Sequence, residues 1–314
     1  MRTNSRGPVP WGPMGATALL WGSAFPTIRI ALSGYPPTSI AVLRIAVALL
    51  LLLPFALFGK VGRLRRADFP RMAAFGLTGM TAYQLLLYAG ERSVEGGTAA
   101  LLITASPVFA TLLGMVCLSE RLTRGGLLGL ATAVSGAVLV ALTAAGDGGT
   151  PAGALSILLA ALAQATSFVL QKPLLTRYSG VECTFYGSLF GILPLLPFLR
   201  SALAHTGAAP GHSNLAVVWL GAACTALAFW TWSRALRAAT AGTASLVLYA
   251  VPVAALGLDA VLLGDAPAPQ ALGGAALVLT GIAVTARGRA GRGGRPPRAP
   301  PGGRGARFRG QGVG

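Results

Sequence analysis

The sequence predicts an all-α membrane protein with ten transmembrane helices, arranged as two inverted five-helix repeats with both termini cytoplasmic. Three observations support this prediction. Only 11% of the 314 residues are charged and 54% are hydrophobic, whereas about 25% of the residues in a soluble domain are charged. Apolar stretches of about 20 residues recur along the chain, and each can cross about 30 Å of hydrocarbon. The third observation is an internal repeat.

Residues 97–141 align with residues 242–286 at a constant offset of 145, and 16 of the 45 aligned pairs are identical. The repeated positions include the triplet at 97–99 and Pro107, which returns as Pro252. Composition alone would give about one identical pair in ten. A membrane protein built from two copies of one helical unit is typically a transporter.

The ten spans are expected where apolar stretches lie between turn-forming or charged residues. They cover about residues 14–33, 38–59, 69–90, 97–118, 125–144, 152–172, 183–200, 214–236, 241–264 and 268–286. The breaks fall at 34–37, 60–66, 91–96, 120–124, 146–151, 177–182, 204–214, 234–240 and 265–269.

The distribution of Lys and Arg sets the orientation, because cytoplasmic loops are enriched in both. With the amino terminus inside, 21 of the 25 basic residues fall on the cytoplasmic side. Five spans per repeat is an odd number, so the second repeat enters the membrane from the opposite side. The loop at 120–124 is basic, and its repeat partner at 265–269 has no arginine. Sequence identity and charge therefore both predict an inverted repeat.

Four segments follow from these spans. Residues 1–13 form a cytoplasmic tail, 14–144 the first repeat, 150–286 the second repeat, and 287–314 an Arg/Gly-rich tail with eight arginines. That tail is too poor in apolar residues to form a core and is expected to be disordered. The net charge of +17 comes largely from this tail and the loops, so membrane lipids, and not nucleic acid, are the expected partners.

The chain resembles the EamA-type transporters of the drug/metabolite transporter superfamily. The resemblance covers about residues 14–286 and includes both copies. It implies a fold of two inverted five-helix repeats that exports or exchanges small metabolites by alternating access. The residues that carry it are Trp21-Gly22-Ser23-Ala24-Phe25-Pro26, Leu43-Arg44, Gly97-Thr98-Ala99-Ala100-Leu101 through Pro107, Leu118-Ser119-Glu120-Arg121-Leu122-Thr123, Gly129 through Gly136, and Gly242-Thr243-Ala244 through Pro252.

Helices 1 and 6 align at an offset of 143, and their aligned faces are candidates for the transport pathway. Trp21 and Phe25 pair with Gln164 and Phe168, and a spacing of four places each pair on one helix face. One turn further on, Arg29 pairs with Lys172. These two cations either line the pathway or extend to the headgroups.

Pro107 and Pro252 recur in helices 4 and 9, where a proline removes a backbone hydrogen bond and bends the helix. Their shared repeat position suggests a role in the pathway or its gate, and packing alone is the alternative. Polar and aromatic side chains in spans are costly unless they face protein or water. The further candidates for a central cavity are Tyr83, Gln84, Tyr88, Thr104, Trp230 and Tyr249.

Arg44 lies about two turns into helix 2, where an arginine is costly unless it is paired or hydrated. It either binds a substrate carboxylate or forms an ion pair with Asp259 or Glu91; the ion pair is the interpretation that we favour from sequence.

The function expected is secondary transport of amino acids or related small metabolites across the inner or plasma membrane. An intramembrane enzyme is disfavoured because the two histidines share one loop and the acids are scattered. A channel or a non-transporting scaffold is the remaining alternative. No catalytic residue, cofactor or metal site is expected. Small-residue faces at 125–136 and 274–281 suggest packing, either within the protomer or in a homodimer.

Overall fold

The computed structural model describes residues 11–118, 150–232 and 246–264, together with isolated positions at 131–132, 135, 273, 276–277 and 280. These residues form helices and turns, and no strand occurs among them. Most of the fifth and tenth expected spans lies outside the described residues. The ten-helix count and the positions of the termini therefore stay predictions.

Helices of the first repeat follow the expected spans closely. A turn at Ser23 divides helix 1, and Thr104 and Ala105 interrupt helix 4 just before Pro107. Helix 3 is continuous from residue 69 to residue 91 but changes winding at its centre. The elements are α1 (Trp11–Gly22), α2 (Ala24–Leu32), α3 (Pro37–Leu57), η1 (Arg66–Asp68), α4 (Phe69–Gly76), η2 (Leu77–Ala82), α5 (Tyr83–Glu91), α6 (Gly96–Ile103) and α7 (Ser106–Leu118).

The second repeat is built in the same way. Helix 7 continues past its expected end at residue 200 to residue 208, because a short 3₁₀ segment joins two α-helical parts. The described part of helix 9 runs through Pro252 without interruption, so only Pro107 is accompanied by a break. The elements are α9 (Pro151–Leu174), α10 (Gly180–Ile192), η3 (Leu193–Phe198), α11 (Leu199–Ala208), α12 (Gly211–Gly221), η4 (Ala222–Leu227) and α15 (Leu246–Leu263).

Five of the described helical segments are long and apolar enough to cross a membrane. They are Pro37–Leu57, Gly96–Gly114, Pro151–Leu174, Gly180–Ala208 and Gly211–Trp232. Their outward faces carry large apolar side chains such as Leu50 and Leu215, which are 67% and 69% exposed. Such exposure of aliphatic side chains suits a surface in contact with lipid and not with water.

The two repeats share a rare backbone feature. Helix 3 is wound as a π-helix at Leu77–Ala82 and helix 8 at Ala222–Leu227, and the two segments occupy equivalent positions of the sequence repeat. Most π-helical turns occur singly and many lie at functional sites. Their recurrence at the offset of the sequence repeat shows that the repeat extends to backbone geometry.

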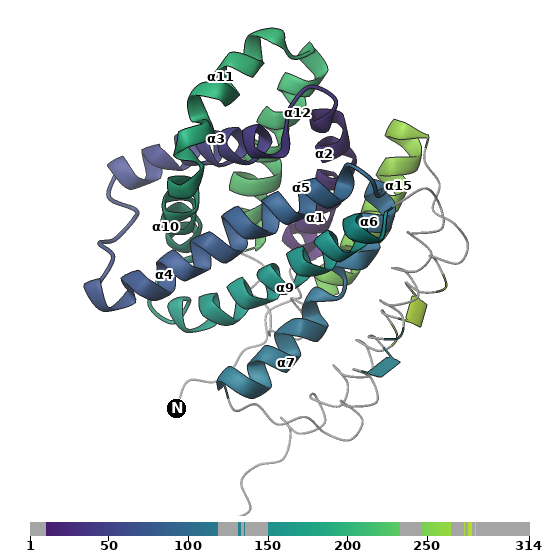
Figure 1. Ribbon diagram of the computed structural model, residues 1–314. Helices are drawn as coiled ribbons and strands as arrows, with labels where there is room; N and C mark the ends of the chain where they lie inside the picture. The colour runs from purple at the N-terminus through teal and green to yellow at the C-terminus, as the bar shows by residue number, and fades with distance from the viewer. Residues whose placement is uncertain are drawn as a thin grey trace, which may run out of the picture.

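Contacts between the helices repeat in the same manner (Figure 1). Helix α4 packs on α10, and its counterpart α12 packs on α3. A Cβ added at Gly76 would lie 2.4 Å from the carbonyl oxygen of Gly187, and one added at Gly221 would lie 2.7 Å from that of Arg44. Gly76 and Gly221 are equivalent positions of the repeat, so a glycine at the same place permits the close approach in each pair.

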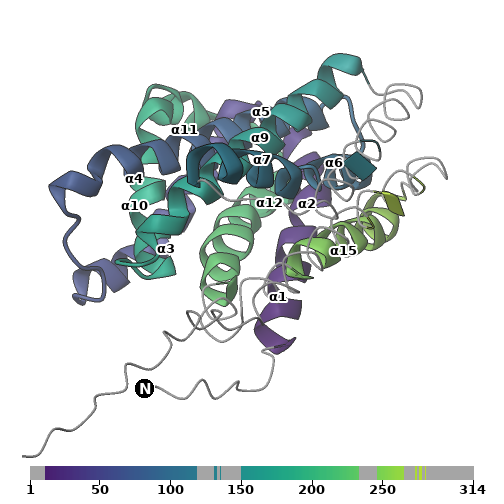
Figure 2. The same cartoon turned by 90° about the horizontal axis from the view of Figure 1, so that it is seen from below.

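Numbered by their expected spans, helix 1 comprises α1 and α2, helix 4 comprises α6 and α7, helix 6 is α9, and the described part of helix 9 is α15. Helix 1 packs against helix 9, and helix 6 packs against helix 4. Helix α1 lies beside α15, and α9 lies beside α7, as Figures 1 and 2 show. Helix α6 also contacts α15, which brings helices 4 and 9 together. The six helices numbered 1, 3, 4, 6, 8 and 9 thus meet around one central region.

Candidate substrate cavity

A cavity of about 90 Å³ lies in this central region, and both repeats contribute to its wall. The volume is sufficient for several water molecules or part of a small solute. Its described lining contains one charged side chain, Arg44.

We call the lining residues of helix 1 the helix-1 face: Trp21, Ala24, Phe25 and Ile28. Their spacing of three and four places them on one side of the helix. Ring centroids of Trp21 and Phe229 lie 5.6 Å apart in an edge-to-face arrangement, which is a favourable aromatic geometry. The helix-1 face is therefore an apolar wall with a fixed aromatic side chain.

The corresponding helix-6 face is more polar: Gln164, Ser167, Phe168 and Gln171 line the same cavity. Each of these residues aligns with its counterpart in the helix-1 face at the common offset of 143. The Ser106 hydroxyl lies 2.6 Å from Gln164 Oε1 and donates to it, which orients that side chain. Two equivalent faces of the repeat thus line one cavity with different chemistry.

Arg44 reaches the cavity from α3 and is only 6% exposed. Its Nε donates to Thr225 Oγ1 at 2.8 Å, and its Nη1 donates to the Tyr88 hydroxyl at 2.9 Å. Tyr88 donates in turn to Gln84 Oε1 at 3.1 Å. Thr225 belongs to the π-helical segment of helix 8, so the unusual winding positions a direct partner of this guanidinium.

One of the two ion pairs expected for Arg44, the pair with Glu91, is absent from the described part of the structure. No ion pair joins Arg44 to Glu91, although Glu91 is buried at 3% exposure. The side chain of Asp259, the other expected partner, lies outside the described residues. Within the part of the chain that the structure describes, the guanidinium is held by neutral hydroxyl groups.

The structure brings most of the residues expected in the pathway to this cavity. Trp21, Phe25, Arg44, Tyr83, Gln84, Thr104, Gln164, Phe168 and Pro252 line it. Tyr88 is not part of the lining but accepts a hydrogen bond from Arg44. Trp230 is 42% exposed and is not part of the lining. The side chains of Pro107 and Tyr249 lie outside the described residues.

Sequence reasoning missed several lining residues, among them Ile28, Ser106, Ser167, Gln171 and Thr225. A signal was available for some of them, because Ile28 and Gln171 are one further turn along the two aligned faces. Thr225 could not be identified in this way, since its position depends on the π-helical winding.

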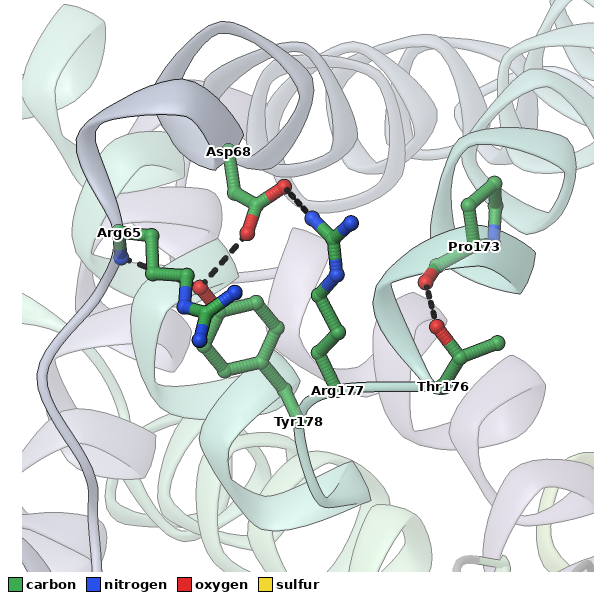
Figure 3. A network of polar contacts seen from close by, with 6 residues as sticks. All are labelled: Arg65, Asp68, Pro173, Thr176, Arg177 and Tyr178. Atoms are coloured by element: carbon green, nitrogen blue, oxygen red, sulfur yellow. Dashed lines mark hydrogen bonds and ion pairs between the residues drawn. The ribbon is translucent and has the colours of Figure 1, made fainter.

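Two polar clusters link the repeats near the ends of the helices, and neither was expected. In the Asp68 clasp, Asp68 accepts hydrogen bonds from Arg177 Nη1 and the Tyr178 hydroxyl, each at 2.9 Å (Figure 3). The Tyr178 hydroxyl also accepts from the backbone N–H of Arg65 at 3.1 Å. The Tyr178 hydroxyl bond and the Arg177 guanidinium hold the pKa of the Asp68 carboxyl below its usual range.

In the Tyr35 clasp, the Tyr35 hydroxyl donates to Asn214 Oδ1, and Ser33 Oγ lies 3.0 Å from Ser213 Oγ. Tyr35 and Tyr178 are equivalent positions, related by the offset that aligns helices 1 and 6. Tyr35 lies two residues before the 21-residue helix α3, and Asp68 follows eleven residues after the last residue of that helix.

Taken together, apolar helices, equivalent halves and a central cavity between them define a membrane protein of the transporter class. The model of the EamA-like transporter family matches residues 14–142 and again residues 151–287. The chain belongs to this family and is a multi-pass protein of the plasma membrane. This confirms the resemblance found from sequence.

Named relatives are also transporters. The chain is 39% identical over 276 residues to a "Probable terminal-alkyne amino-acid exporter" of Streptantibioticus cattleyicolor, covering 88% of this chain and 93% of the relative. It is 30% identical over 279 residues to an "Uncharacterized transporter" of Archaeoglobus fulgidus, covering 88% and 98%. It is 29% identical over 278 residues to a "Probable amino-acid metabolite efflux pump" of Salmonella typhimurium, covering 85% and 91%.

A protein of known crystal structure has the same fold, with a TM-score of 0.59 and 22% sequence identity. The match covers 89% of this chain and 97% of that chain. Family and relatives agree that the chain is a transporter and give no indication of an enzyme.

Proposed function

We propose that this protein is a secondary transporter that exports or exchanges amino acids or related small metabolites by alternating access. The observation that carries the proposal is the central cavity, which is lined by equivalent faces of the two repeats. A site on the interface between inverted repeats can be reached from either side when the repeats exchange conformations. The names of two relatives, an amino-acid exporter and an amino-acid metabolite efflux pump, support the substrate range.

We further propose that residues 14–144 and 150–286 are the two five-helix units, inserted in opposite orientations with both termini cytoplasmic. The recurrence of π-helical segments and glycine contacts at fixed offsets supports a duplicated unit. The excess of Lys and Arg in alternate loops supports the orientation.

Transport by the purified protein in proteoliposomes tests the proposal. We expect saturable uptake of a labelled neutral amino acid that is accelerated by unlabelled substrate on the opposite side, as exchange requires. A screen of amino acids for rescue of cells from toxicity would select the label. Uptake that rises linearly with concentration for every compound would contradict a carrier and favour a scaffold or a pore.

Trp21→Ala is the variant that links this transport to the cavity. Trp21 lines the cavity, whereas Trp230 is partly exposed and does not. We expect Trp21→Ala to reduce the initial rate at least about tenfold, because the loss of about 1.4 kcal/mol of binding energy has that effect. Trp230→Ala is the matched control and should retain most of the rate; equal rates in the two variants would remove the cavity from the pathway.

A further inference from the structure

Arg44 combines three properties that are rarely found together in a membrane-spanning helix. It is 6% exposed, it lines the central cavity, and the two hydrogen-bond acceptors that hold it are uncharged. A charged side chain in a span is costly and usually pairs with an opposite charge or lines a pathway. Among the described side chains, no carboxylate forms an ion pair with it.

The geometry leaves the guanidinium able to bind an anion. An arginine has five N–H donors, and the hydroxyl groups of Thr225 and Tyr88 engage two of its nitrogens. Both hydroxyls donate elsewhere, Thr225 to the Leu220 carbonyl at 2.9 Å and Tyr88 to Gln84. They therefore act toward Arg44 only as acceptors, which fixes the fork, and no described carboxylate forms an ion pair with it.

We propose that Arg44 anchors the carboxylate of the transported solute, an inference that rests on the proposed function. A carboxylate would supply the missing negative charge and match the planar fork of the guanidinium. The described lining offers no acidic side chain that would neutralise a cationic ligand. The site therefore selects solutes with one carboxylate and disfavours solutes in which that group is masked.

The helix-1 face and the helix-6 face determine where the other groups of the solute bind. Trp21 and Ile28 of the helix-1 face, with Phe229 and Val251, form an apolar surface for a short uncharged side chain. Gln164 and Gln171 of the helix-6 face can hydrogen-bond a polar group such as an amine. The substrate class is thus small amphipathic monocarboxylates, bound in one orientation between the two faces.

Binding to the purified protein tests this class without requiring turnover. The probes are neutral amino acids with short apolar side chains, each paired with its carboxamide, and the readout is the concentration that half-saturates a thermal shift. We expect the acids to stabilise the protein and the carboxamides to require at least about tenfold higher concentrations. Arg44→Gln should abolish this preference, and Arg44→Lys should keep a weaker one because lysine lacks the planar fork.

Two controls separate the anchor from general effects of charge. Arg29→Gln removes a cation that does not line the cavity, so the preference for acids should persist. Asp259→Asn should also leave it unchanged. Tighter binding of acids to Asp259→Asn would show that Asp259 occupies the guanidinium, and would overturn the proposal.

Ile28→Gln and Gln171→Ile exchange the chemistry of equivalent positions and test the orientation. We expect Ile28→Gln to weaken binding of acids with short apolar side chains relative to glycine, which has none, and Gln171→Ile to weaken binding of glycine and of these acids alike. Equal binding of acids and carboxamides to the unaltered protein, or no binding of any acid, would overturn the carboxylate anchor. Normal acid binding with no flux in proteoliposomes would instead contradict the proposed transport and leave the anchor standing.

Discussion

The Asp68 clasp and the Tyr35 clasp hold equivalent ends of the two repeats together, and they differ in charge. Each centres on a buried tyrosine, Tyr178 or Tyr35, whose hydroxyl donates across the repeat interface. The acceptor is a carboxylate paired with Arg177 in one clasp and the neutral amide of Asn214 in the other. The tyrosine is common to both clasps, whereas the acceptor differs with its electrostatic surroundings.

Those surroundings follow from the proposed orientation. Asp68 lies in the loop that carries Lys60, Arg63, Arg65 and Arg66, and the positive charge of Arg65 contributes to the lowered pKa of its carboxyl. The Tyr35 clasp belongs to the opposite side, where basic residues are few. Under the proposed inverted insertion, duplication preserves geometry while the side of the membrane determines charge.

The strongest disruption is expected at the glycines on the helices next to each clasp. A Cβ at Gly76 would lie 2.4 Å from the Gly187 carbonyl oxygen, and one at Gly221 would lie 2.7 Å from the Arg44 carbonyl oxygen. Gly76→Leu and Gly221→Leu should both abolish the monodisperse peak in size-exclusion chromatography, because backbone atoms cannot yield to a side chain. Gly15→Leu, at a position with no neighbour within 4 Å, is the control. A normal peak for one variant would show that the halves are not packed equivalently.

A smaller effect is expected from removal of the two hydroxyls. Tyr178 makes two hydrogen bonds through its hydroxyl and Tyr35 makes one, and both residues are buried. At about 1 kcal/mol for each bond, Tyr178→Phe should lower the thermal midpoint more than Tyr35→Phe. Thermal unfolding in detergent, followed by intrinsic fluorescence, measures both. The reverse order would mean that the neutral clasp carries more of the stability.

The pH dependence distinguishes the clasps most specifically. The folded pKa of Asp68 is lowered, so its stabilising effect is fully present above the ordinary pKa of an aspartate and is lost as pH falls through the folded value. Between about pH 5 and pH 3, around the ordinary pKa of an aspartate, the thermal midpoint should therefore fall more steeply in the natural protein than in Asp68→Asn. Asn214→Ala should leave the slope unchanged. Parallel profiles for all three proteins would refute the charged character of the Asp68 clasp.

Much of this architecture could be predicted from the sequence, because apolar length and the offset between the repeats are properties of the chain itself. The ends of α3 and α9 lie close to the expected bounds, and the aligned faces of helices 1 and 6 do line a cavity. The π-helical segments could not be predicted, since no residue type marks a turn wound around an additional residue. Thr225, one of the two partners of Arg44, depends on that winding, whereas Tyr88 lies in the regular helix α5.

The two clasps show that an alignment of the repeats does not reveal tertiary contacts. Tyr35 and Tyr178 share the offset of helices 1 and 6 and could have been noticed in the alignment. Their acceptors, Asp68 and Asn214, begin the equivalent helices 3 and 8 but differ in type and fall one residue apart in the offset of 145, so the alignment does not reveal the contact. Repetition in a sequence locates equivalent positions, but it does not identify what those positions touch.

In the proposed mechanism, equivalent faces of the two repeats form one solute site that opens to both sides of the membrane. Ala24→Cys and Ser167→Cys place one thiol on each face, at equivalent positions of helices 1 and 6. In oriented vesicles, a membrane-impermeant maleimide should label each thiol from either side, and a bound neutral amino acid should slow both reactions. Labelling from one side only, or protection of one face but not the other, would contradict the claim.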